Sequence, residues 1–165
     1  MRDRTIIRRT FLAGAGGATV IALALEPVIR WALRDRDYDL GMLQLTLAYN
    51  TGVGFSVGAR QPVWLLVAVT AALTVALLIY GWRSAGKVPV ITTGGLALMS
   101  GGAGANVIDR ALDGRVTDYF HTGWWPTFNL ADAFLSVGVV LVIIGAVWEE
   151  RHSAPATRTG LDTGR

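Results

Sequence analysis

Four long, mostly apolar stretches alternate with shorter polar segments along the chain. The apolar stretches cover residues 11–33, 63–82, 88–108 and 130–148. A transmembrane helix needs about 20 consecutive, predominantly apolar residues, and irregular backbone is not tolerated in contact with lipid. The pattern therefore predicts an integral membrane protein, mainly α-helical, with four transmembrane helices.

Lys and Arg side chains are unevenly distributed between the two sides of the predicted spans. Nine lie in the N-terminal tail (1–10), the loop between the second and third spans, and the C-terminal tail (149–165). Five lie in the connections 34–62 and 109–129. Because basic residues favour the cytoplasmic side, we predict that both tails are cytoplasmic and that the two connections lie outside. The polar C-terminal tail is predicted to be disordered.

The first outer connection has the features of a small β region over about residues 37–62. Residues 42–49 partly alternate between apolar and polar types and are rich in residues that favour strands. Asn50, Gly52, Gly54 and Gly58 follow and supply turn chemistry. We therefore predict a small extracytoplasmic β-sheet at the membrane surface.

The composition narrows the classes of function. Hydrophobic residues make up 52% of the 165, and only 16% are charged, against about 25% in a typical soluble domain. The net charge of +3 is not gathered into one stripe, which argues against a nucleic-acid partner. The absence of cysteine excludes disulfides, thiol catalysis and cysteine-ligated metal, and the two histidines leave no His-rich zinc site.

Acidic residues at the edges of the spans are the first candidates for chemistry, because charge in a membrane is costly. Asp132 lies near the start of the fourth span, and Asn129, three residues earlier, shares its helix face. Asp118 lies in a short outer connection that can bring it close to Asp132. Two adjacent carboxylates can act as acid and base toward water and a peptide bond. By spacing alone, Asp132 is equally consistent with a first-turn acid that the helix dipole favours.

Two further polar groups lie within or at the end of a span. Glu26 and Arg30 are four residues apart in the first span, so we predict that they form a structural ion pair. Asp109 and Arg110 close the third span, where Asn106 shares their helix face. Asp109 and Arg110 are consistent with an anchor of the helix end at the membrane interface as well as with a site.

Four short segments resemble sequence boxes of the lipoprotein signal peptidases (signal peptidase II). The segment NTGVGFS at 50–56 resembles the box NxGxxFS, and GGAGANVIDR at 101–110 resembles GGAxGNxIDR. The segment VTDYF at 116–120 resembles VxDF, and FNLADAF at 128–134 resembles FNxAD. The boxes occur in the family's order, and the resemblance covers about residues 20–148.

The resemblance implies a membrane aspartic peptidase that uses no metal and no other cofactor. Such an enzyme removes the signal peptide from bacterial prolipoproteins and cuts before a cysteine that carries diacylglycerol. The resemblance implies that Asp118 and Asp132 are the catalytic pair. The residues that match positions shaping the site or contacting substrate are Asn50, Gly52, Asn106, Asp109, Arg110 and Asn129.

The resemblance also implies a location and a set of partners. It implies a location in the bacterial cytoplasmic (inner) membrane, with an active site near the outer surface. We expect the protein to be a monomer, although the sequence itself does not determine its oligomeric state. The expected partners are membrane lipids and the diacylglyceryl-modified prolipoprotein, with no nucleic acid. Inhibition by the cyclic peptide globomycin is expected on the same ground.

Some residues depart from the family's pattern and keep two other interpretations open. Glu26 and Arg30 stand where the family usually has Asp and Lys, and Ala105 replaces a Gly. One alternative is a non-catalytic relative that binds lipidated segments. The other is a small proton-coupled membrane protein in which Glu26, Asp109 and Asp132 form a relay. A transporter is expected to contain repeated halves, which this sequence does not show.

Overall fold

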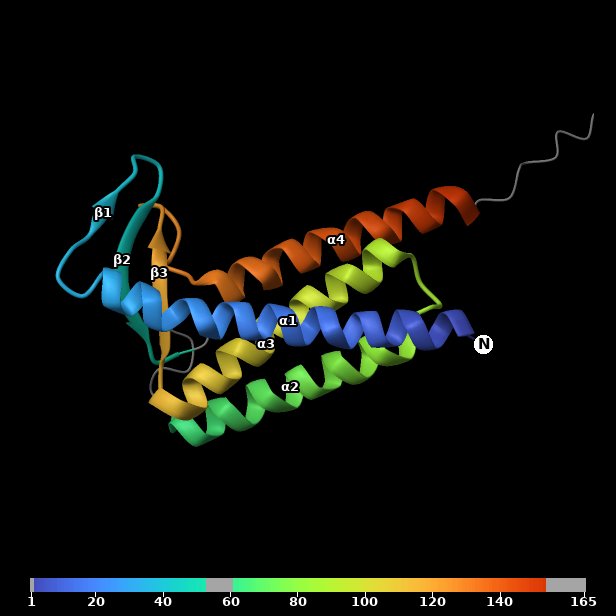
Figure 1. Cartoon of the computed structure of the whole chain (residues 1–165), viewed down its shortest axis with the longest axis horizontal. Helices are drawn as coiled ribbons and strands as arrows, with labels where there is room; N and C mark the ends of the chain where they lie inside the picture. The colour runs from blue at the N-terminus through green and yellow to red at the C-terminus, as the bar shows by residue number, and fades with distance from the viewer. Residues whose placement is uncertain (1, 53–60, 154–165) are drawn as a thin grey trace, which may run out of the picture.

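Four helices and a small sheet make up the protein in a computed structural model, which describes residues 2–52 and 61–153. The helices are α1 (Arg2–Ala32), α2 (Val63–Ser84), α3 (Val90–Asp113) and α4 (Leu130–Ser153), and the strands are β1 (Tyr38–Asp39), β2 (Gln44–Asn50) and β3 (Val116–His121). The helices lie alongside one another, and the sheet lies across one end of the bundle (Figure 1). The predicted fold class, a mainly α-helical membrane protein with four helices and a small β region, is confirmed.

Within the described residues, three helices are long and apolar enough to cross a membrane. These segments are Arg4–Ala32, Val63–Ser84 and Leu130–His152. The remaining helix, α3, is not among them, because it is rich in Gly, Ser and Thr. It packs against α1, α2 and α4 and so forms the centre of the bundle.

Glycines let α3 approach its neighbours closely. A Cβ at Gly95 would lie 2.6 Å from the carbonyl oxygen of Gly138 on α4. A Cβ at Gly102 would collide with the carbonyl oxygen of Ala131, at the start of α4. Backbones packed this closely need small residues at the interface. The spacing between α3 and α4 is therefore set by positions that have no side chain.

All four helices extend beyond the predicted membrane spans. Residues 2–10 belong to α1, residues 83–84 continue α2, and residues 109–113 continue α3. Residues 149–153, predicted to be disordered, are helical and continue α4. Hydropathy detects only the apolar part of a helix, whereas backbone hydrogen bonds continue it into polar sequence. In α3 the helix stops at Gly114, which has a φ of 71° and donates its N–H to the Arg110 carbonyl. The remaining tail, 154–165, lies outside the described residues.

The sheet has the strand order β1-β2-β3 and is antiparallel throughout. The predicted β region contains β1 and β2, while residues 53–60 lie outside the described residues. The third strand, β3, comes from the second outer connection and was not predicted as a strand. Asp118 stands in β3 opposite Ala48 of β2. Since side chains alternate along a strand, Asp118 faces one way and its neighbours Thr117 and Tyr119 face the other.

Candidate active site

A cavity of about 470 Å³ lies between β3, the middle of α2, the C-terminal part of α3 and the start of α4. Its polar lining includes both candidate carboxylates, Asp118 from β3 and Asp132 from α4. Leu73 and Leu77 from α2 contribute to an apolar wall. The cavity therefore combines two carboxyl groups with an apolar surface between the helices.

Asp118 is buried at the centre of β3, with 3% of its surface exposed. Its Oδ1 accepts a hydrogen bond from Asn129 Nδ2 at 3.1 Å. Burial, and then the nearby charge of Asp132, raise the pKa of Asp118 to about 7, against the opposing effects of an Asn50 hydrogen bond and Arg110. Asp118 therefore holds a proton at a pH where an ordinary aspartate is ionised.

Asp132 lies in the first turn of α4 and uses both carboxylate oxygens as acceptors. Oδ2 accepts the backbone N–H of Asn129 at 3.2 Å, while the Asn129 side-chain oxygen accepts the N–H of Asp132 at 3.0 Å. This reciprocal pair is a capping box. Oδ1 accepts Asn106 Nδ2 at 2.7 Å. Asp132 is thus the helix-capping acid that its spacing allowed, and it also lines the cavity.

Two asparagines connect the carboxyl groups. Asn129 Nδ2 donates to Asp118 and also to the side-chain oxygen of Asn106 at 3.0 Å. Asn106 in turn donates to Asp132. A continuous chain of hydrogen bonds therefore links the acid on β3 to the acid on α4 through α3.

Arg110 is a buried cation beside the carboxyl groups, with 4% of its surface exposed. Its Nη2 donates to the carbonyl oxygen of Gly52 at 2.6 Å. The Gly52 N–H donates to Asn50 Oδ1 at 2.9 Å, which fixes the turn after β2. The Arg110 Nε has no hydrogen-bond partner in the part of the chain that the structure describes.

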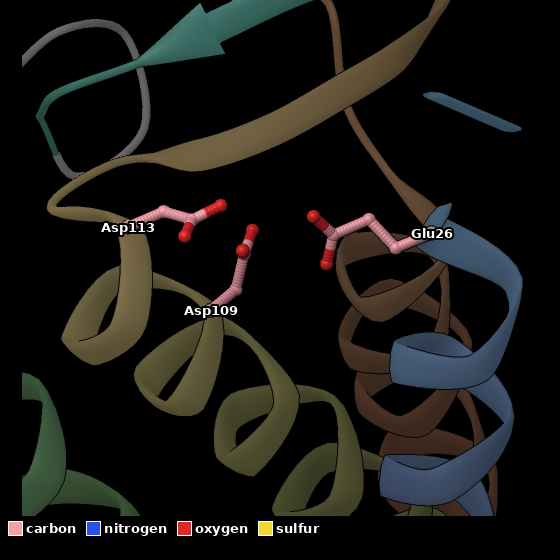
Figure 2. Close-up of side chains that lie close together, drawn as sticks. All are labelled: Glu26, Asp109 and Asp113. Carbon is pink, nitrogen blue, oxygen red and sulfur yellow. The ribbon is translucent and has the colours of Figure 1, made fainter. Parts of the chain in front are cut away.

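A second group of polar residues, here called the rear cluster, lies on the other side of β3. It consists of Glu26, Arg30, Asp109, Asp113 and Thr117. Figure 2 shows Glu26 on α1 pointing toward Asp109 and Asp113 on α3. Arg30 Nη2 lies 2.5 Å from both Glu26 and Asp113 and 3.4 Å from Asp109. The i,i+4 ion pair of Glu26 and Arg30 is therefore part of a larger network.

The rear cluster also holds the backbone of β3. Asp109 Oδ2 accepts the N–H of Thr117 at 2.9 Å, and Arg30 Nη2 donates to the Thr117 hydroxyl at 2.6 Å. Thr117 directly precedes Asp118. Asp109 therefore contributes to the site from behind the strand and is not one of the residues lining the cavity.

The three carboxylates of the rear cluster share one arginine. Glu26, Asp109 and Asp113 offer oxygens within 4.8 Å of one another, a spacing that a metal ion could use. However, the Arg30 guanidinium already contacts all three carboxylates. Its planar, multi-donor group is well suited to this role.

We expect Arg30→Met to destabilise the protein by about 1–3 kcal/mol, because it leaves three carboxylates without their shared cation, in a partly exposed position. The thermal unfolding midpoint in detergent measures this effect. Arg34→Met, which removes an exposed arginine at the same end of the bundle, is the matched control. Equal midpoints for the two variants would contradict the assigned role of Arg30.

Sequence reasoning missed some residues of this region. Asp113 lies four residues after Asp109, so its position on the same face of α3 could have been predicted from the sequence. The contacts of Thr117 with Asp109 and Arg30 depend on the strand β3, which the pattern of apolar and polar residues did not predict. Ala105, a departure from the family boxes, packs in a small cluster with Ala22 and Ala131. Its added methyl is therefore accommodated.

A known protein family matches most of the chain. A profile of the family described as signal peptidase (SPase) II matches residues 18–148. The chain belongs to the signal peptidase II family. Most of the described helical bundle and the whole sheet fall within the matched range.

Individual relatives extend this finding. A lipoprotein signal peptidase of Neisseria gonorrhoeae is 35% identical over 150 residues, covering 80% of this chain and 88% of the relative. One from Mesorhizobium japonicum is 47% identical over 105 residues, covering 61% and 62%. One from Syntrophomonas wolfei is 38% identical over 118 residues, covering 68% and 76%. Membership of the signal peptidase II family makes the protein a membrane peptidase.

The fold has a counterpart among solved structures. A structure described as a bacterial membrane enzyme, determined by the in meso method, superposes with a TM-score of 0.76 and 22% identity. The match covers 89% of this chain and 93% of the other. At this identity the likeness concerns the fold alone.

Proposed function

We propose that the protein is an aspartic endopeptidase of the bacterial inner membrane that removes the signal peptide from diacylglyceryl-modified prolipoproteins. It cuts the peptide bond before the lipidated cysteine. One observation carries the proposal: Asp118 and Asp132, from different elements, line one cavity and are linked through Asn129 and Asn106. The names of the relatives supply the substrate class.

The two carboxyl groups divide the chemistry between them. Asp132, as the carboxylate, takes a proton from water while the water oxygen attacks the carbonyl carbon. Asp118 gives its proton to the carbonyl oxygen. When the intermediate collapses, the C–N bond breaks, Asp132 gives its proton to the amine, and Asp118 regains one from a hydroxyl. The pair then returns to its starting state.

Other groups of the cavity position the substrate. Arg110 lines the cavity beside the carboxyl groups, and its positive charge can attract a peptide carbonyl there. The apolar wall on α2 and α4, including Leu73, Leu77 and Leu135, suits a hydrophobic signal peptide or an acyl chain. The cavity lies at the sheet end of the bundle, which the distribution of basic residues predicts to be the outer end.

The substrate requirement can be tested with purified protein in detergent. One sample receives diacylglyceryl-modified prolipoprotein, and the other receives the same prolipoprotein without the lipid. We expect cleavage of the modified substrate only, with a product whose mass begins at the lipidated cysteine. A folded protein that binds the modified substrate and never cuts it would establish the non-catalytic alternative.

The pH dependence of cleavage follows from the raised pKa of Asp118, which must be protonated to act as the acid. We expect kcat/KM to fall about twofold from pH 6 to 7 and to approach a tenfold loss per pH unit above that range. A pH–rate profile on the modified substrate measures this. An activity that rises between pH 7 and 9 would contradict the assigned acid.

A further inference from the structure

Tyr119, the residue after Asp118, points to the rear side of β3 and is almost completely buried, with 2% of its surface exposed. Its hydroxyl oxygen accepts the backbone N–H of Leu130 at 3.1 Å. Leu130 is the first residue of α4. A side chain on the strand that carries Asp118 is thus bonded to the helix that carries Asp132.

The bond completes the capping of α4. The first N–H groups of a helix have no partner within it and must find one elsewhere. Asn129 and Asp132 satisfy each other's N–H groups from within the capping box. The Leu130 N–H lies between these two and is satisfied from β3. The hydroxyl therefore caps the helix from a different element, and this ties the two elements together.

We propose that the Tyr119 hydroxyl is a positioning group that holds the first turn of α4 against β3 and so sets the placement of Asp132 relative to Asp118. The inference rests on the proposed function for its catalytic consequence. The box that β3 resembles has Phe at this position, so the hydroxyl is a feature in which this chain departs from the pattern. Tyr119 is not among the residues that line the cavity, so it acts through the two carboxyl groups.

Backbone hydrogen bonds near Tyr119 support its positioning role. The Tyr119 and Phe120 N–H groups both donate to the Phe128 carbonyl, at 3.0 and 2.8 Å. These bonds return the chain to β3 just before α4 begins. The next two residues are bonded to β3 through side chains. Asn129 Nδ2 donates to Asp118, and the Leu130 N–H donates to the Tyr119 hydroxyl.

Tyr119→Phe is the first test, because it keeps the ring and removes only the oxygen. We expect kcat on the modified prolipoprotein to fall roughly tenfold while KM changes less than about twofold, since the acids are misplaced and the substrate surface is intact. Tyr80→Phe, on the exposed side of α2, is the matched control and should behave as the parent. A kcat for Tyr119→Phe within twofold of the parent would overturn the proposal.

Leu130→Pro removes the other half of the same hydrogen bond. Proline has no N–H and is well tolerated at the first position of a helix. Leu130→Ala, which keeps the N–H, controls for loss of the side chain. We expect Leu130→Pro to lower kcat more than Leu130→Ala does, and Tyr119→Phe to add nothing in the Leu130→Pro background. Fully multiplicative effects of the two changes would overturn the proposal.

Amide hydrogen exchange separates this inference from the proposed function. We expect exchange in the segment 128–132 to be at least about tenfold faster in Tyr119→Phe than in the parent and in Tyr80→Phe. Unchanged exchange would overturn the tether. A parent protein that cuts no prolipoprotein would instead overturn the proposed function, and the exchange result would still decide whether the hydroxyl holds α4.

Discussion

Replacing either Asp118 or Asp132 with Asn should lower the rate of prolipoprotein cleavage by at least about a thousandfold. An amide can neither donate the proton that Asp118 supplies nor accept the proton that Asp132 takes from water, and general acid–base catalysis contributes about 10²–10⁴-fold for each group. Each variant is measured by single-turnover cleavage of the diacylglyceryl-modified substrate. Because the two acids act as a unit, the double variant should be little slower than either single one.

The stability of these variants distinguishes chemistry from folding. Asp118→Asn should unfold at the same or a higher temperature above pH 7, because ionising the buried Asp118 carboxyl is unfavourable there. Asp132→Asn keeps one acceptor oxygen in place of two, so a modest loss of stability is expected. Asp35→Asn, on the exposed connection after α1, is the control. Cleavage by both site variants at the parental rate would refute the dyad.

The second large effect is expected from Gly102→Ala. A Cβ at this position collides with the Ala131 carbonyl oxygen and lies 3.2 Å from the backbone nitrogen of Leu135. Relieving the collision requires α4 to move away from α3 by about 1 Å, and misplacement of this size can cost about 100-fold in rate. Overpacking of this kind also costs about 1–3 kcal/mol of stability. Asp132 follows Ala131 directly, so it moves with the helix.

Gly94→Ala provides the matched control for this effect. It is the same substitution on the same helix, but a Cβ at Gly94 has no neighbour within 4 Å. We expect Gly94→Ala to cleave at the parental rate and to be at least as stable, since Ala is the better helix former. Thermal midpoints and cleavage rates of the two variants should be compared side by side. Similar values for both would show that the spacing of α3 and α4 does not control the site.

The sequence was most informative where the signal is local. Long apolar runs predicted the helices, and i,i+4 spacing predicted the contact of Glu26 with Arg30. The spacing of Asn129 and Asp132 likewise allowed a capping role. These relations depend on one helix at a time, so no knowledge of the fold was needed.

Relations between elements could not be predicted in the same way. The contact of Arg30 with Asp113 joins α1 to α3, and that of Tyr119 with Leu130 joins β3 to α4. Both depend on the packing of segments that are distant or differently oriented in the fold. The short connection before α4 suggested that Asp118 and Asp132 lie close together, but spacing alone left a structural role for Asp132 open, and the family boxes favoured the catalytic interpretation.

The capping role of Asp132 has a consequence for interpreting related chains. An acid at this position benefits the start of α4 whether or not the protein hydrolyses anything. A descendant that lost its enzymatic activity would therefore still be under selection to keep it. Asp118 lies in a strand and caps no helix, and its burial is unfavourable for the ionised form. Asp118 is thus the more diagnostic of the two when a degenerate homologue must be told from a working enzyme.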